Sequence, residues 1–235
     1  MGRDGHERLR RIPAASTGRQ ISSRAFPDSG YYLLQCGHRN EVDRLSVTFD
    51  CGDLGFGPLA AHGHADALSF TLRAFGREVF VDPGTYDYFT DRRWRDYFRG
   101  TRAHNTVVVD GQDQSQMQGP FLWGRRAQAR CLRWEACHAG GTVVGEHDGF
   151  TGSAGGVTHR RSITLDGERR EVLVRDELRG SGRHEGSMYL HLSEDCRVRG
   201  SGPGRSAGRS LGQASPLQDA PLGVRSATMR DHDPA

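Results

Sequence analysis

The chain has 235 residues, of which only 35% are hydrophobic, and its 32 basic residues are all arginine. They nearly balance 29 acidic residues, which leaves a formal net charge of +3. Nucleic-acid-binding proteins usually carry a basic tract or face, so we expect no nucleic-acid partner. No apolar run reaches the ~20 residues that a membrane-spanning helix needs, so we expect no membrane insertion.

The two ends of the chain differ from its middle in composition and in hydrophobic periodicity. Residues 1–28 are polar and arginine-rich, which predicts a linker or arm. The basic start has no apolar segment behind it, so we expect no signal peptide in this chain. Residues 199–235 lack hydrophobic periodicity, which predicts a disordered tail. The folded domain is therefore expected over residues 29–198.

Short segments with strand periodicity fill this middle part. In residues 68–74, Leu68, Phe70 and Leu72 alternate with polar residues, as in a strand with one buried face. Strands are predicted at 31–35, 45–49, 67–75, 78–82, 105–111, 128–134, 142–148, 159–165, 170–178 and 187–192. Many short strands separated by turn residues predict an all-β fold, an antiparallel β-sandwich.

Turn signals separate several of these strands. The stretch "FGRE" (75–78) predicts a hairpin turn with Gly76 at positive φ. The stretch "LDGE" (165–168) carries the Asp-Gly pair favoured in type I′ hairpins. Residues 90–104 lack the alternation of polar and apolar residues that is typical of strands, because Trp94 and other aromatic residues lie among arginines. This segment is expected to be a short helix or a long functional loop, and we favour a loop with one helical turn.

Side chains capable of chemistry lie at the ends of the predicted strands. The stretch "HGHAD" (62–66) precedes one strand, Asp82 ends another, and His104 precedes a third. Two histidines and a carboxylate from three strand ends predict a divalent-metal site, and zinc accepts this ligand set. His62 and His64 share one face of an extended segment, so spacing does not decide which of them binds metal. Solvated surface histidines are the simpler alternative.

Arginines cluster around the aromatic residues of segment 90–104. The guanidinium group suits bidentate contact with carboxylates or sulfates, so Arg95 and Arg99 are predicted to bind substrate. A solvated loop is the alternative. The later histidines, including His147 and His159, are expected to be structural or exposed.

Three strings together resemble one protein family. They are "HGHADALSFTLRAFGREVFVDPGTYDY", "RDYFRGTRAHNTVVVDGQDQS" and "FLWG". In this order they resemble the C-terminal region of the heparinase II/III-like polysaccharide lyases, specifically over residues 28–124 and more loosely to about residue 198. The resemblance implies a β-sandwich that follows a toroid of helices, with a cleft between them for an acidic polysaccharide or oligosaccharide.

The resemblance also assigns roles to individual residues. It implies one structural zinc ion (Zn²⁺) bound by three residues, His64, Asp82 and His104. It places His62 and Tyr86 at the active site, where we expect them to be catalytic. The implied reaction is β-elimination on a uronate sugar, and it needs groups that stabilise the developing charge.

A helical domain is not visible in this sequence. We therefore expect a partial chain that supplies the zinc-bearing half of the cleft and is poorly active alone. One alternative is a non-catalytic, metal-stabilised carbohydrate-binding sandwich. Another is a cupin-type iron oxygenase, since two histidines and a carboxylate also suit iron, but the D-P-G-T-Y and A-H-N-T strings do not favour it. By family analogy, we expect the protein in the cell envelope or periplasm, or secreted.

Overall fold

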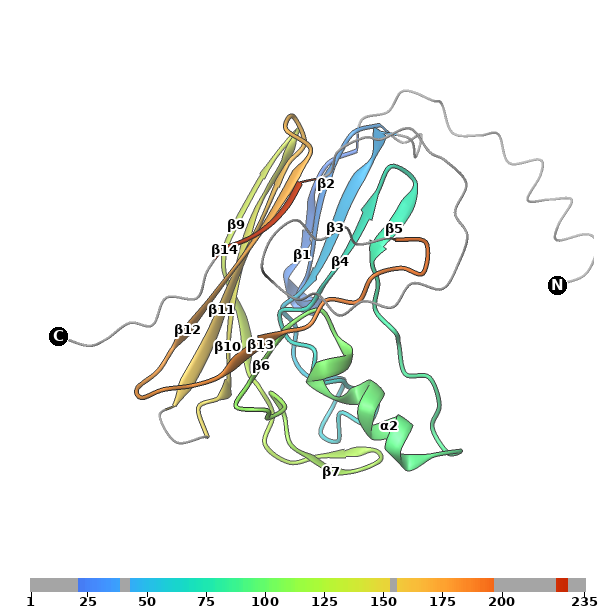
Figure 1. Cartoon of the computed structure of the whole chain (residues 1–235), viewed down its shortest axis with the longest axis vertical. Coiled ribbons are helices and arrows are strands. Elements are labelled where there is room, and N and C mark those ends of the chain that lie inside the picture. Colours follow the sequence, from blue (N-terminus) through green and yellow to red (C-terminus); the bar gives the residue numbers. More distant parts are fainter. Residues whose placement is uncertain (1–20, 39–42, 153–155, 197–222, 228–235) are drawn as a thin grey trace, which may run out of the picture.

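The computed structural model describes residues 21–38, 43–152 and 156–196, and residues 223–227 as a strand. Two five-stranded sheets lie face to face (Figure 1). The first sheet contains β1 (Arg24–Phe26), β2 (Tyr31–Cys36), β3 (Leu45–Asp50), β4 (Phe70–Ala74) and β5 (Arg77–Phe80). The second contains β9 (Ala129–Cys137), β10 (Gly140–Phe150), β11 (Val157–Asp166), β12 (Glu171–Arg179) and β14 (Gly223–Ala227). The remaining elements are β6 (Val107–Val109), β7 (Met117–Gly119), β8 (Leu122–Trp123), β13 (Gly186–Met188), α2 (Arg92–Arg99), η1 (Pro27–Ser29) and η3 (Thr101–Ala103).

The sandwich confirms the predicted all-β fold. Neighbouring strands pair antiparallel throughout the described chain except for β14, which runs parallel to β12. Strand β14 falls in the segment 199–235 that was expected to be disordered. Local composition did not indicate it, because its pairing partner lies far earlier in the chain. Strand β1 likewise takes in the end of the predicted arm 1–28, whose first twenty residues lie outside the described part.

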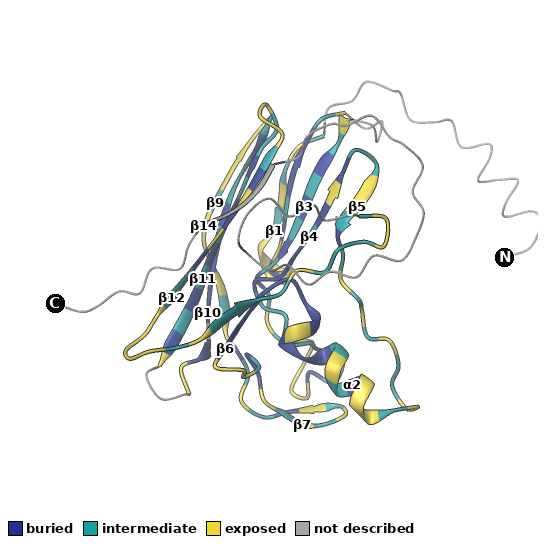
Figure 2. Cartoon of the chain, viewed as in Figure 1, coloured by how far each residue is buried: buried dark blue, intermediate teal, exposed yellow. Residues whose placement is uncertain are grey.

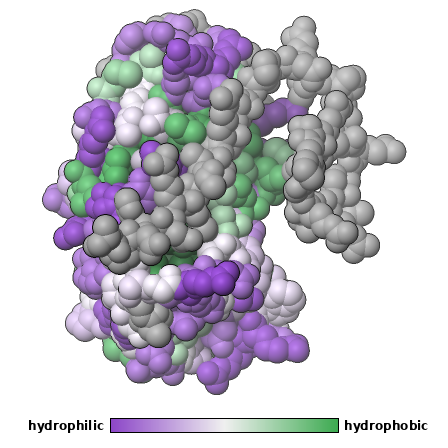
Figure 3. All heavy atoms as spheres, turned by 60° about the vertical axis from the view of Figure 1, so that its left-hand side comes forward, coloured by the Kyte–Doolittle hydropathy of each residue, from purple (hydrophilic) through white to green (hydrophobic). Residues whose placement is uncertain are grey.

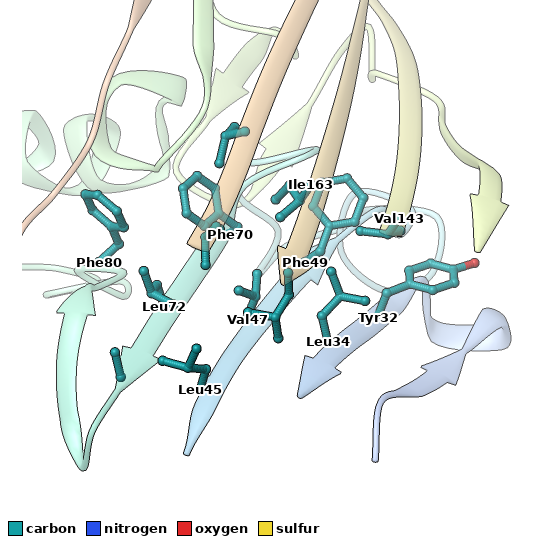
Figure 4. Close-up of a cluster of buried hydrophobic side chains, with 14 of the residues drawn as sticks. Tyr32, Leu34, Leu45, Val47, Phe49, Phe70, Leu72, Phe80, Val143 and Ile163 are labelled. Carbon is teal, nitrogen blue, oxygen red and sulfur yellow. The ribbon is translucent and has the colours of Figure 1, made fainter. Parts of the chain in front are cut away.

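The apolar core lies between the two sheets. Strand β3 alternates buried and half-buried residues along its whole length, as the sequence pattern predicted (Figure 2). Leu34, Val47 and Phe49 from the first sheet are fully buried against Val143 and Ile163 from the second. Figure 4 shows these side chains pointing toward one another across the interface. Apolar burial of this kind is what holds the two layers together.

Two turn predictions had different outcomes. The β4–β5 turn has Phe75 at φ 54° and Gly76 at φ 77°, which confirms the predicted hairpin. The β11–β12 hairpin exists, but Asp166 pairs with Glu171 and the loop has four residues between them. Within that loop Arg170, with φ 55°, adopts the left-handed conformation. The type I′ prediction for the Asp-Gly pair was therefore wrong.

Segment 90–104 is more helical than expected. Helix α2 spans Arg92–Arg99, and the Asp91 carboxylate caps it by accepting a bond from the Arg93 N–H at 2.8 Å. The 3-10 helix η3 follows at once. The extent of the helix was underestimated because its buried positions are Arg95 and Arg99, so apolar periodicity is absent. Within the described residues, no helix has the length and apolar character needed to cross a membrane.

Polar and apolar surfaces are unevenly distributed. On the face drawn in Figure 3, hydrophilic side chains cover much of the lower part, and hydrophobic side chains gather nearer the middle. Helix α2 and strands β6 and β7 lie below the first sheet in Figure 1. We call this lower part the site end, because the predicted site residues lie there.

Candidate metal centre and its surroundings

The loop that carries "HGHAD" is fixed by side chains from distant segments. The hydroxyl of Thr106 and the side-chain amide of Gln114 both donate to the carbonyl of Ala67, at 3.1 and 3.0 Å. The backbone N–H of Ala65 donates to the carbonyl of Arg99 at 2.8 Å. These bonds hold the loop on both sides of Asp66, so Thr106 and Gln114 help to build the site.

Asn105 fixes the other two strand ends. Its side-chain amide donates to the carbonyls of Phe70 and Val81, at 2.8 and 3.0 Å, and its oxygen accepts from the His191 N–H at 2.6 Å. Phe70 begins β4, and Val81 directly precedes Asp82. The buried side chain of Asn105, next to His104, therefore fixes the distance between the start of β4 and the segment that leads to Asp82.

The structure brings two of the three predicted ligands together and adds a carboxylate. Ligand-type atoms of His64, Asp66 and His104 all lie within 4.8 Å of one another. Asp82 lies beside this group and accepts a 2.6 Å bond from Nδ1–H of His104. The fully buried His104 then presents Nε2, which has no hydrogen-bond partner. A metal-binding histidine commonly donates its other N–H to a carboxylate in this way.

Burial and charge shift the pKa values of this cluster. Burial, with a smaller effect of His104, lowers the pKa of His64 to about 4. Burial, and then the charge of Asp50, raises the pKa of Asp66 to about 7. Burial also acts on His104, but its bond to Asp82 and the nearby carboxylates outweigh it and raise the pKa. Neutral His64 and crowded carboxylates form an environment that favours a bound cation.

His62 and His64 face different surroundings. Both line an open pocket of about 870 Å³, together with Asp50 and Asp66. His62 is exposed, and His64 contacts the hydroxyl of Thr85 at 3.3 Å. Asp50 and Asp66 were absent from the predicted site. Two features of the sequence could have indicated them. Asp66 follows His64 by two residues, and Asp50 stands at the end of a predicted strand.

Tyr86 is separated from His62 in its ring contacts. Tyr86 is 67% exposed, and its ring stacks on Phe98 with the centroids 5.0 Å apart. Its backbone adopts the left-handed conformation, with a φ of 58°. His62 contacts Tyr88 and Phe121 instead. Among the described residues, no ring contact joins the two predicted catalytic residues, so their joint action stays a prediction.

Arg95 and Arg99 are fully buried, in contrast to the expected contact with substrate. Arg95 donates to the hydroxyl of Thr85 at 2.6 Å and to the carbonyl of Ala61 at 3.3 Å. Arg99 donates to the carbonyl of Gly119 at 2.8 Å and lies 4.8 Å above the ring of Trp123. Their guanidinium groups support the site loops from inside the protein.

A buried arginine of the second sheet reaches the same loops. Arg161 donates through Nη1 to the carbonyls of Leu68 and Asn105, at 2.8 and 2.5 Å. Its Nε and Nη2 form a bidentate pair with Asp176, at 2.7 and 3.0 Å. The sequence gave no sign of this link, because Arg161 stands between Arg160 and Ser162, and a charged residue there predicts an exposed position and not a buried one.

Two histidines continue this network. The Gly149 N–H donates to Nδ1 of His147, so Nε2 of His147 carries the hydrogen that bonds Nδ1 of His159 at 3.1 Å. Nε2 of His159 then donates to Asp176 at 2.7 Å. Both histidines are buried, which confirms the expectation of a structural role. Every bond has a defined direction, so the network holds one arrangement.

The comparisons with known proteins agree with this architecture. The family model "Heparinase II/III-like, C-terminal" matches residues 18–226, so the chain belongs to that family. This membership leaves the cupin-type alternative without support. A comparison with curated protein sequences found no match.

Solved structures show the same fold. The "Heparinase III-BT4657 gene product" matches with a TM-score of 0.54 and 23% identity, over 70% of this chain and 23% of that chain. Heparan sulfate lyase HepC from Pedobacter heparinus matches with a TM-score of 0.58 and 22% identity, over 74% of this chain and 25% of that chain. This chain thus spans about a quarter of the length of these neighbours.

Proposed function

We propose that this chain is the β-sandwich part of a polysaccharide lyase that cleaves uronate-containing acidic polysaccharide by β-elimination. The observation that carries the proposal is the split between the two histidines. His62 is exposed, while the half-buried His64 belongs to the cluster with Asp66 and the buried His104. Family membership and the heparan sulfate lyase among the structural neighbours support the substrate class.

In the proposed reaction, the proton α to the uronate carboxylate is removed and the bond to the 4-linked oxygen breaks. The electron pair left by the proton forms the new double bond, and the leaving oxygen takes up a proton. His62 would donate a hydrogen bond to the carboxylate as negative charge develops on it. The exposed phenol of Tyr86 is the proposed proton-transfer group, and its position relative to His62 is part of the proposal.

We also propose that this site holds a zinc ion with a structural role. The donor set fits, because the buried Nε2 of His104 lacks a hydrogen-bond partner, and ligand-type atoms of His104, His64 and Asp66 lie within 4.8 Å of one another. Asp82 is proposed either as a further ligand or as the carboxylate that orients His104. A bound zinc ion would supply positive charge to the crowded carboxylates and hold the loop that bears His62.

Zinc binding is tested on the full chain by metal analysis and by thermal unfolding with and without a chelator. We expect about one zinc ion per chain, and stabilisation of roughly 2.7 kcal/mol at a hundredfold excess of free zinc over its dissociation constant. His64→Ala is expected to abolish this stabilisation. The matched control is His138→Ala, at an exposed histidine. Equal zinc stabilisation in both variants would contradict the site.

Asp66→Asn and Asp82→Asn separate the two carboxylates. A direct ligand should lose most of the zinc affinity when replaced. Replacing a residue that only orients His104 should lower the zinc affinity about ten- to a hundredfold, as is typical when the hydrogen-bond partner of a metal ligand is replaced. Titration of each variant with zinc against a chromophoric chelator measures the difference.

The lyase proposal is tested by following the unsaturated uronate product in the ultraviolet, with heparan sulfate and other polyuronates as substrates. We expect binding of acidic oligosaccharides, and weak product formation that His62→Ala and Tyr86→Phe reduce further. Rapid turnover by this chain alone would contradict the idea that it supplies one half of the catalytic groups. Absence of both binding and product would overturn the lyase proposal.

A second candidate function is a metal-stabilised carbohydrate-binding module without catalysis. It is favoured by the ring contacts of the two proposed catalytic residues, because His62 contacts Tyr88 and Phe121 whereas Tyr86 stacks on Phe98. The same assay separates the two proposals. A module binds the oligosaccharide, forms no unsaturated product, and gives no difference between wild type and Tyr86→Phe in product formation.

A further inference from the structure

A group of aromatic rings lies beside His62. The rings of Tyr88 and Phe121 are nearly parallel, with 17° between their planes and 5.9 Å between centroids. Phe89 packs against both, at 6.1 and 5.9 Å. The imidazole of His62 meets Tyr88 and Phe121 edge-on, at 5.6 and 6.2 Å. We call Tyr88, Phe89 and Phe121 the aromatic platform.

The platform is held in place from two sides. The carboxylate of Asp87 accepts bonds from the backbone N–H groups of Tyr88, Phe89 and Thr90, so the loop has a fixed turn. On the inner side, the buried Arg95 guanidinium lies 4.9 Å from the Tyr88 centroid and 5.3 Å from that of Phe121. A surface fixed in this way loses little conformational entropy when it binds a ligand.

The outer side of the platform is open to water. Phe89 is 86% exposed, although the turn beneath it is ordered. Single exposed hydrophobic residues are common, but Phe89 continues into Tyr88, Phe121 and the exposed His62. No described contact within the protein accounts for an aromatic ring held outward at this position. The arrangement indicates a surface that is covered by a ligand.

We propose that the aromatic platform is a sugar-binding subsite, on which a pyranose ring of an acidic oligosaccharide packs its C–H face. This inference rests on the proposed function. A pyranose has an apolar face of about the size of an aromatic ring and a polar rim. Phe89 and Phe121 suit the face, and the neighbouring imidazole of His62 suits the rim.

Charge around the platform favours an acidic ligand. Helix α2, which begins directly after the platform loop, carries four arginines. The acidic residues of its N-cap and body, Asp91 and Asp96, leave an excess of two positive charges. Arg92 and Arg93 are exposed but pair with Asp96 and Asp91, at 3.4 and 2.9 Å, so the excess lies on the buried Arg95 and Arg99. Arg95 lies against the rings of Tyr88 and Phe121, so its positive charge favours the carboxylates or sulfates of a uronate-containing chain on the platform.

The platform is connected to the metal centre through Arg95. Its Nη1 donates to the hydroxyl of Thr85, which also contacts Nε2 of His64. Its Nη2 donates to the carbonyl of Ala61, directly before His62. A sugar on the platform therefore lies next to the histidine proposed to face the reacting unit, and would position the neighbouring sugar of the chain against it.

Isothermal titration of the full chain with a heparan sulfate hexasaccharide tests the subsite. Phe89→Ala and Phe121→Leu are expected to weaken binding about three- to tenfold, the range typical of one aromatic contact. The control is Leu173→Ala, which shortens an exposed apolar residue of the second sheet and should leave binding unchanged. Because Phe89 is so exposed, its variant should unfold in urea like wild type.

Three outcomes would overturn the subsite, and they are distinguishable. If both variants bind the oligosaccharide as tightly as wild type, the platform is not a sugar-binding subsite, but the proposed function is not contradicted. Absence of binding by wild type removes the proposed function as well. A change in sedimentation of Phe89→Ala relative to wild type, with unchanged sugar affinity, assigns the platform to contact between protein chains.

Discussion

The inward face of strand β11 changes character along its length. Near the β11–β12 hairpin, Ile163 and Leu165 pack into the apolar core, whereas toward the site end His159 and Arg161 occupy the same face. All four side chains are fully or almost fully buried. The sandwich interior is therefore apolar at the hairpin end and contains a hydrogen-bonded polar network toward the site end, where Val157 and Phe150 form a smaller apolar cluster beside it.

The two ends differ in how strictly they define atomic positions. Apolar burial has no preferred direction, so a core accepts substitutions that keep its volume. In the polar network each group has a specific partner, as in the bidentate pair of Arg161 with Asp176. This end also holds the loops that carry the candidate site. Directional bonds are the means by which a sheet can fix the carbonyls beside His104 and Asp66.

Breaking the polar network should have the largest effect. Arg161→Met leaves two buried backbone carbonyls without their donor and removes the bidentate partner of Asp176, which keeps the bond from His159. We expect a loss of about 3–5 kcal/mol in the free energy of unfolding. Urea unfolding measures it.

The matched control for this substitution is the preceding residue. Arg160→Met removes a half-exposed arginine that pairs with Glu146 on the outer side of the same strand. Its expected cost is below about 1 kcal/mol. Similar losses in the two variants would show that the buried network has no special weight. The zinc affinity of Arg161→Lys, measured in the same experiments, shows whether the polar network also positions the proposed zinc ligands.

The response to pH should differ between the network and the metal centre. Burial lowers the pKa values of His147 and His159, so they remain neutral in the folded protein. Their contribution to stability is present above the ordinary histidine pKa and is lost as pH falls. Burial raises the pKa of Asp66 to about 7, so its contribution is present at low pH and is lost as pH rises toward that value.

Asp66→Asn isolates the second of these effects. In chelator-treated protein, lowering the pH from about 7.5 to about 5.5 should stabilise wild type relative to this variant, by roughly 1–2 kcal/mol. Urea unfolding of both proteins at the two pH values gives the difference. A difference of the opposite sign would mean that Asp66 is stabilised as a carboxylate in the folded protein.

A conservative change in the apolar core should have the smallest effect. Ile163→Val removes one methylene group from a fully buried side chain. Its expected cost is about 0.5–1.5 kcal/mol, with no change in zinc affinity. A loss of zinc affinity in this variant would show that the two ends of the sandwich are coupled. Metal titration of Ile163→Val and Arg161→Lys side by side makes this comparison.

Much of the sandwich was predictable because its signal is local. Alternation in β3 and β4 and the Phe75–Gly76 turn follow from the geometry of a half-buried strand. Helix α2 was underestimated because Arg95 and Arg99 occupy its buried positions. Strand β14 was missed because its pairing with β12 is not local. Patterns of neighbouring residues carry no information on such distant partners.

For the candidate site, the strand-end positions predicted that His104 meets a histidine of the HGHAD stretch, and the family resemblance selected His64. The sequence by itself determined which residue types stand at these strand ends, because strand periodicity fixes where a strand stops. Only the tertiary structure decided that Asp66 joins the group, that Asp82 bonds His104, and that Arg95 supports the loops. The physical reason is that donors from separate segments of the chain converge through hydrogen bonds to loop carbonyls, and these bonds form only when the chain has folded.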